Sequence, residues 1–133
     1  MSTLEKFQSN FVNYVGIEVL SLDNGVARMS LSLREELLNS GGMAHGGVLA
    51  TLADSAGGAA AFSLLPYEKM AVTTDFQITC LKSSSCESLN AVATVIHQGR
   101  RFMRSEVEIT AGGSLLAKAG VSFMVIERPN YQL

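Results

Sequence analysis

One aspartate, Asp54, lies in the middle of a segment made mostly of alanine, glycine and leucine, and this segment begins with His45-Gly46-Gly47. Burying a carboxylate without a partner costs free energy, so an acid at this position needs either solvent or a function. On an α-helix, residues nine apart lie on opposite sides and about 13 Å apart along the axis, so His45 and Asp54 cannot meet within one chain. If both serve one reaction, a second copy of the chain must supply one of them, and the site lies at a homodimer interface.

The glycine pair at the start of this segment is suited to binding a carbonyl oxygen. A helix N-terminus presents unpaired backbone N–H groups and the positive end of the helix dipole, and Gly46 and Gly47 let a substrate approach them closely. Such an arrangement is an oxyanion hole, and Asp54 is the matching candidate for a general base or nucleophile.

One long helix and about six strands are predicted around these residues. The helix spans about 46–65, because its apolar residues form a broad stripe and Pro66 stops it. Before it, the alternating segment around Asp23-Asn24-Gly25 predicts a hairpin. After it come four strand-like runs, at residues 70–81, 87–98, 101–111 and 115–126. Neither a long apolar helix nor an antiparallel sheet can bury its face alone, so we expect the sheet to wrap the helix in an α+β fold.

Two further features complete the expected architecture. Ser2 and Glu5 form a capping-box pattern that begins a short amphipathic helix, which ends at Gly16. Gly57-Gly58 would weaken an isolated helix, so they indicate close packing of a strand or of the partner's helix. A chain of 133 residues fits one domain, which we place at residues 1–133.

The composition narrows the class of protein. With 47% hydrophobic and only 17% charged residues, the chain is not a disordered tail, and its sparse polar cover predicts self-association. A net charge of −2 gives no field for nucleic acid or an anionic membrane, and no segment is typical of a membrane span or an export signal, so we expect a cytoplasmic protein. Cys80 and Cys86 lack the spacing of a redox pair or zinc site and are expected to be reduced thiols.

The residues singled out above also match a known family. Asn39, His45-Gly46-Gly47 and Asp54 resemble the signature of hotdog-fold acyl-CoA thioesterases of the PaaI-like (phenylacetyl-CoA thioesterase) family. The stretches "VTTDFQITCLK", "HQGRRFMRSEVEIT" and "LLAKAGVSFMV" resemble its later strands, so the similarity covers roughly residues 10–127. The resemblance implies the hotdog fold, in which a sheet wraps a central helix, and the hydrolysis of acyl-CoA thioesters, with aryl-acetyl or medium-chain acyl groups. A thioester needs only a polarised carbonyl and an attacking water or carboxylate, because a thiol leaves readily, so no metal or cofactor is expected.

The resemblance also implies a role for each site residue. Asp54 would act as general base or nucleophile, and the Gly46 N–H would donate to the thioester carbonyl oxygen. Asn39 and His45 would position water, substrate and loop, and Thr73 would hold the water in the subunit that supplies Asp54. Three of them have a structural alternative: a paired acid for Asp54, a helix N-cap for His45 and a turn residue for Asn39.

Basic side chains are candidates for the phosphates of coenzyme A, since guanidinium groups suit phosphate geometry. We expect Arg100 and Arg101 to bind them, with Lys82 and Arg104 nearby, although all four also fit ordinary solvated charges. The family resemblance further implies a homotetramer built as a dimer of dimers. Phe62, Met70, Phe76 and the N-terminal helix are expected to shape the acyl pocket.

Two other functions fit the same fold. A hotdog hydratase acting on enoyl or hydroxyacyl thioesters would carry a histidine followed by Phe-Pro, or an Asp and a His a few residues apart, and the chain has neither pattern. A non-catalytic acyl-CoA-binding module would commonly lose the helical acid, whereas Asp54 is present. A transcriptional version would also need a DNA-reading helix pair, which one short N-terminal helix does not supply.

Overall fold

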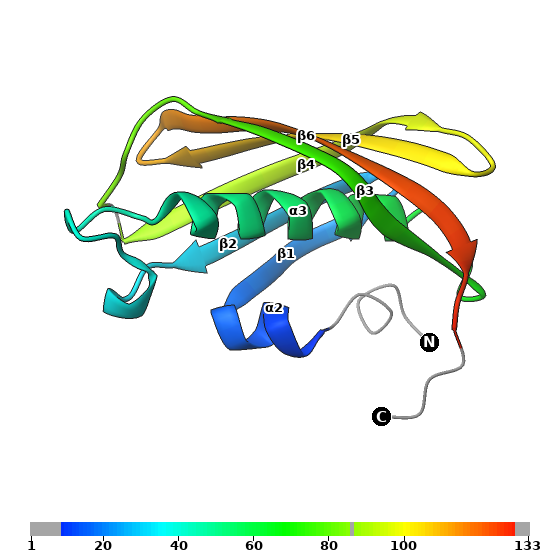
Figure 1. Ribbon diagram of the computed structural model, residues 1–133, viewed down its shortest axis with the longest axis horizontal. Helices are drawn as coiled ribbons and strands as arrows, with labels where there is room; N and C mark the ends of the chain where they lie inside the picture. The colour runs from blue at the N-terminus through cyan, green and yellow to red at the C-terminus, as the bar shows by residue number, and fades with distance from the viewer. Residues whose placement is uncertain (1–8, 86, 130–133) are drawn as a thin grey trace.

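A single antiparallel sheet wraps around one long helix in the computed structural model of this chain, which describes residues 9–85 and 87–129. The sheet contains β1 (Ile17–Asp23), β2 (Val26–Ser32), β3 (Lys69–Cys80), β4 (Ser88–Gln98), β5 (Phe102–Ala111) and β6 (Ser114–Glu127). Their order across the sheet is β1-β2-β4-β5-β6-β3, and the helix α3 (Gly46–Phe62) runs across its concave side (Figure 1). The predicted α+β hotdog architecture is therefore confirmed.

The first hairpin forms where the turn residues predict it. Asn24 and Gly25 both adopt positive φ angles, 48° and 85°, which suit a tight turn between twisted strands. Asp23 then pairs with Val26, and the alternation of β2 buries Met29 on the helix side. The hairpin is also fixed to α3, because the Gly25 N–H donates to the Ser63 hydroxyl at 2.7 Å.

The helix α3 ends at Phe62, three residues before the predicted end at Leu65. The N–H groups of Leu64 and Leu65 donate to the carbonyls three residues before them, so the last turn is tighter than an α-helix. The Ser63 hydroxyl also donates to the Ala60 carbonyl at 2.7 Å. The pattern located the end of the apolar run, but local hydrogen bonds end the α-helix earlier.

Close packing between α3 and the sheet is centred on Gly57. A Cβ atom added there would lie 3.3 Å from Val121 Cγ2 and 3.5 Å from Val107 Cγ2, so a strand and not a second helix explains this glycine. The buried Ser105 hydroxyl donates to the Gly57 carbonyl at 3.0 Å, which joins β5 directly to the helix backbone. The central half of α3 is thereby held against β5 and β6.

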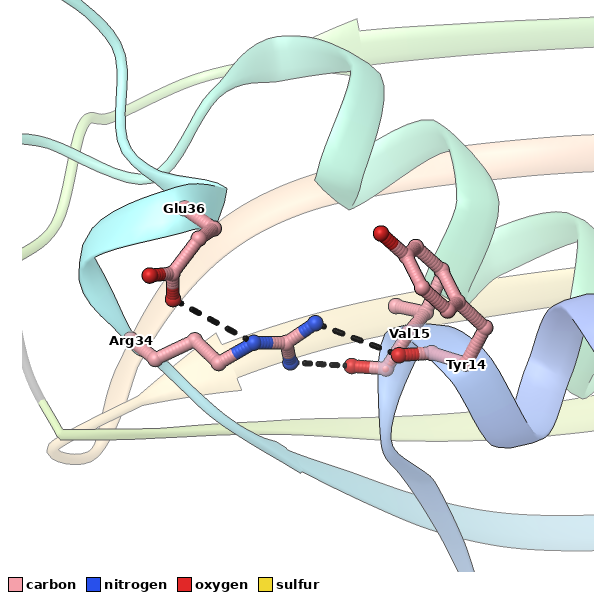
Figure 2. Close-up of polar contacts among 4 residues, drawn as sticks. All are labelled: Tyr14, Val15, Arg34 and Glu36. Atoms are coloured by element: carbon pink, nitrogen blue, oxygen red, sulfur yellow. Dashed lines mark hydrogen bonds and ion pairs between the residues drawn. The ribbon is translucent and has the colours of Figure 1, made fainter.

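A short helix, α2 (Asn10–Val15), precedes β1 and ends before Gly16, as predicted. It begins later than predicted, because Ser9 is extended and caps it by accepting from the Val12 N–H, and the Ser2 and Glu5 capping box lies outside the described residues. Arg34 binds the end of α2, donating to the carbonyls of Val15 at 2.6 Å and Tyr14 at 3.1 Å (Figure 2). Arg34 also pairs with Glu36 in the short 3-10 helix η1 (Glu35–Leu37) at 3.5 Å. This arginine therefore connects α2 to the segment that leads into α3.

Two remaining expectations concern membranes and cysteines. Across the described ranges, no helix combines the length and apolar character needed to cross a bilayer. Cys80 is an exposed free thiol at the end of β3, and Cys86 lies outside the described residues.

Candidate active site

Asp54, the only charged residue of α3, accepts a hydrogen bond from Thr73, which the family resemblance assigned to holding the water. Thr73 on β3 donates from Oγ1 to Asp54 Oδ1 at 2.8 Å. A β-bulge follows at Thr74, because the pairing with β6 passes from Thr73 opposite Phe123 to Asp75 opposite Ser122. Bulges redirect side chains near functional sites, and this one keeps Thr73 directed at the helix while the strand continues.

Two cavities meet at Asp54. The larger has a volume of about 400 Å³ and is bordered by Phe62, Met70 and Phe123, together with Phe11 of α2. The smaller, about 290 Å³, is bordered by Ala50, Thr51 and Phe76. Asp54 and Thr73 line both.

The residues expected to shape an acyl pocket are divided between these two cavities. Phe62 and Met70 border the larger one and Phe76 borders the smaller one. Asp54 lines both cavities, one of which is lined by aromatic and thioether side chains, so a substrate in either cavity can reach its carboxylate.

The N-terminus of α3 has one free donor and not two. The His45 ring accepts from the Gly47 N–H at Nδ1, at 2.8 Å, so this amide is already paired, contrary to the expectation for the Gly46-Gly47 pair. The next two amides, of Val48 and Leu49, donate to the His45 carbonyl. Within the described part of the chain, the Gly46 N–H has no partner, and a Cβ added at Gly46 would meet nothing within 4 Å.

These hydrogen bonds fit the N-cap alternative for His45, and His45 also holds the loop in position. Because Nδ1 accepts a hydrogen bond, the proton of the neutral imidazole lies on Nε2. The backbone N–H of His45 donates to the Leu37 carbonyl at 3.0 Å, which fixes the residue at the point where the loop enters α3.

The loop before α3 is closed by Asn39. Its side-chain Oδ1 accepts from the N–H groups of Gly41 at 2.8 Å and Met43 at 3.1 Å, as in a turn residue. Asn39 also lines a cavity of about 220 Å³ with Gly46 and Lys82. The structure thus brings three predicted site residues, Asn39, Lys82 and Gly46, together at the N-terminal end of α3.

Asp54 and Gly46 do not belong to one site within a single chain. Eight residues of α3 separate them, about 12 Å along the axis, and they border different cavities. This separation agrees with the expectation that one copy of the chain cannot complete the site.

The predicted phosphate cluster is wrong for a single chain. Lys82 follows the end of β3, whereas Arg100 and Arg101 lie in the turn between β4 and β5, at the opposite end of the sheet. Phe102, next to Arg101, pairs with Met124 of β6, and Met124 pairs in turn with Val72 of β3. Val72 lies eight residues before Cys80, the last residue of β3, which is roughly 26 Å along the strand.

Arg104 does not join Lys82 either, because its Nη1 donates to the Ser122 hydroxyl at 2.8 Å, and Ser122 pairs with Asp75, five residues before the end of β3. No group of three or more histidine, cysteine, aspartate or glutamate side chains that suits a metal occurs among residues 9–85 and 87–129.

One residue that the sequence did not single out reaches the larger cavity. Arg128, directly after β6, lines this cavity together with Asp54. No local pattern marks it, since its place depends on the pairing of β6 with β3.

Known proteins with the same fold give the family. The sequence profile of the thioesterase superfamily matches residues 41–118. A relative from Saccharolobus solfataricus, whose name is no more specific than esterase, is 32% identical over 92% of this chain and 82% of its own length. Acyl-coenzyme A thioesterase PaaI from Escherichia coli (strain K12) is 33% identical over 71% of this chain and 66% of its own length.

A solved structure of a conserved protein from Pseudomonas aeruginosa has a TM-score of 0.88 and 33% identity, covering 92% of this chain and 98% of that one. The profile match alone includes the loop of Gly46, the helix of Asp54 and the strand of Thr73. The chain therefore belongs to the thioesterase superfamily, as a PaaI-like hotdog protein.

Proposed function

We propose that this protein hydrolyses acyl-CoA thioesters to the free acid and coenzyme A at sites shared between two copies of the chain. The observation that carries the proposal is the arrangement of α3: a carboxylate held by Thr73 at mid-helix, and an unpaired Gly46 N–H at its N-terminus. The name of the PaaI relative supports coenzyme A thioesters as the substrate class.

The edge of the sheet supports the pairing of two copies. β3 has 12 residues and a sheet neighbour on one side only, so its other edge presents free N–H and C=O groups. Two β3 strands related by a two-fold axis would pair antiparallel, with their helices antiparallel beside them. That arrangement brings Asp54 of one chain toward the partner's Gly46.

The reaction follows from these groups. The Gly46 N–H donates to the thioester carbonyl oxygen and stabilises the negative charge that develops there. Asp54 takes a proton from a water that attacks the carbonyl carbon, or attacks this carbon itself and is released by water afterwards. In both routes the C–S bond breaks, the hydroxyl of water ends on the acid, and coenzyme A leaves as the thiol after gaining a proton.

Thr73, His45 and Asn39 act on the groups that react. Thr73 fixes Asp54 Oδ1 and leaves Oδ2 available for water or substrate. His45 and Asn39 hold the loop so that the Gly46 N–H points out of the helix end.

Lys82, in the cavity beside Gly46, is placed to bind a phosphate of coenzyme A. Antiparallel pairing would bring the partner's Arg100 and the partner's Arg101 to the same end. A tetramer, a single domain over residues 1–133 and a cytoplasmic location remain predictions.

Release of free thiol from phenylacetyl-, benzoyl-, hexanoyl- and decanoyl-CoA tests the activity. We expect kcat/KM of Asp54→Asn to fall at least about 100-fold, the usual size for loss of a general base. Glu106→Gln, which removes one exposed carboxylate from the opposite face of β5, is the matched control and should change kcat/KM little. A chain that binds these thioesters but cleaves none of them would be a binding module.

Mixing two inactive variants tests the shared site. Asp54→Asn and Gly46→Val are each expected to be inactive, and their heterodimer contains one site with both native groups. After unfolding and refolding an equal mixture, about a quarter of the wild-type activity should return, because half of the dimers are mixed and each has one intact site. Mixtures that stay inactive, although the subunits exchange, would show that Asp54 and Gly46 act within one chain or do not act together.

A further inference from the structure

The far end of the larger cavity carries a cation that the proposed reaction does not use. Arg128 lines this cavity together with Asp54, Phe62 and Met70. Its guanidinium lies over two aromatic rings, with Cζ 5.8 Å from the ring centroid of Phe62 and 4.7 Å from that of Tyr67. Stacking of this kind holds the planar group while its edge remains able to donate hydrogen bonds.

The backbone fixes the guanidinium but does not use all of its donors. Nε donates to the Tyr67 carbonyl at 2.7 Å and Nη2 reaches the Lys69 carbonyl at 3.4 Å, while the backbone N–H of Arg128 donates to the Glu68 carbonyl. A guanidinium has five N–H donors, so several are left for a ligand. None of the ion pairs found among the described residues involves Arg128. A held cation without a carboxylate partner at a cavity wall is suited to bind an anionic group.

Two elements give the distance between Arg128 and Asp54. Along α3, eight residues separate Asp54 from Phe62, about 12 Å. Along β3, four residues separate Thr73 from Lys69, roughly 13 Å. Reacting atoms and ionic hydrogen bonds each take about 3 Å at the two ends, which leaves roughly 6 to 7 Å for the acyl group. An extended chain advances about 1.2 Å per bond, so this gap corresponds to about five to six bonds.

We infer that Arg128 selects acyl groups that carry a carboxylate about five to six bonds from the thioester carbonyl carbon. This inference rests on the proposed function and names the substrate class of the same site. The thioester end lies at Asp54, the chain or ring between lies against Phe62 and Met70, and the distal carboxylate binds the free N–H groups of Arg128. A neutral acyl group of the same length fills the same space but leaves those donors without a partner.

Two substrates of equal chain length test the inference. Heptanoyl-CoA and the mono-CoA thioester of heptanedioic acid differ only at the distal end, and the ratio of their kcat/KM values does not depend on the fraction of folded enzyme. We expect the wild type to favour the carboxylate substrate about 10- to 100-fold, the usual size for a charged hydrogen bond. Arg128→Met should abolish this preference, and Arg128→Lys, which keeps the charge but not the planar fork, should retain part of it.

Lys69→Met is the matched control, because Lys69 is a neighbouring cation that pairs with Glu127 and does not line the cavity. It should leave the substrate ratio unchanged, and an equal loss of preference in this variant would overturn the role of direct contact with Arg128. A wild type that cleaves heptanoyl-CoA at least as well as the carboxylate substrate would overturn the inference and leave the thioesterase proposal standing. A wild type that cleaves neither of these nor any of the four thioesters above would overturn the proposed function itself.

Discussion

Replacing Gly46 with alanine should separate the stability of the protein from its activity. A Cβ atom at this position meets nothing within 4 Å among the residues that the structure describes, and Gly46 does not need a positive φ. Alanine restricts the unfolded chain more than glycine and favours the helix, so the free energy of unfolding should rise by up to about 1 kcal/mol. The empty space that accepts the methyl group is also the space through which a thioester carbonyl would approach the Gly46 N–H.

The expected cost appears only in catalysis. Moving the carbonyl by about 1 Å costs on the order of 100-fold in rate, and an oxyanion donor is worth about 100- to 1,000-fold, so kcat/KM should fall by about 100-fold. Thiol release measures the activity, and thermal and urea unfolding measure the stability.

Gly41→Ala is the control, since it makes the same change in the same loop at a position whose Cβ would meet only Asn39 Oδ1, at 3.4 Å. A kcat/KM within threefold of wild type in Gly46→Ala would refute the close approach at Gly46. A lower free energy of unfolding in Gly46→Ala would contradict the assumption that the space beside Gly46 is empty in the folded protein.

Three more substitutions probe the contacts of α3. Thr73→Val removes the hydrogen bond to Asp54 and should lower kcat about 10-fold with KM nearly unchanged; unaltered steady-state kinetics would remove Thr73 from the site. His45→Ala removes the N-cap and should cost about 1 kcal/mol in urea unfolding, with His45→Asn restoring most of it. Ser105→Ala removes the buried bond to the Gly57 carbonyl and should also cost about 1 kcal/mol, with kcat/KM per folded molecule unchanged; a large catalytic loss would show that β5 positions Asp54.

The sequence was sufficient where the signals are local. The turn at Asn24-Gly25, the strand alternation of β2 and the apolar run of α3 each depend on neighbouring residues, and the structure has all three. The sequence predicts an end of α3 that is three residues too late, because Pro66 marks only the position that the helix cannot pass. The Ser63 hydroxyl donates within the tighter last turn and accepts a hydrogen bond from the Gly25 N–H. No sequence pattern indicates these two hydrogen bonds.

The parts of the site that were missed depend on the sheet. Lys82 follows β3 and Arg101 follows β4, and both strands are predicted from the sequence. Only the pairing of the strands shows that the two residues lie at opposite ends of the sheet. Arg128 reaches the larger cavity through the same pairing. Within α3 the spacing of Gly46 and Asp54 was enough to show that one chain cannot unite them, because helical geometry is fixed by residue number alone.

The irregular edge of β3 also bears on aggregation. A long strand edge with free backbone groups is a template for any extended segment, and such edges are a common starting point for unwanted association. Here the bulge at Thr74 breaks the regular spacing of the edge, and Asp75 adds an exposed charge next to it. A foreign strand with regular spacing cannot follow this edge along its whole length, whereas a second copy carries the same irregularity. The distortion that directs Thr73 toward Asp54 thus also discourages fibril-like growth along this edge.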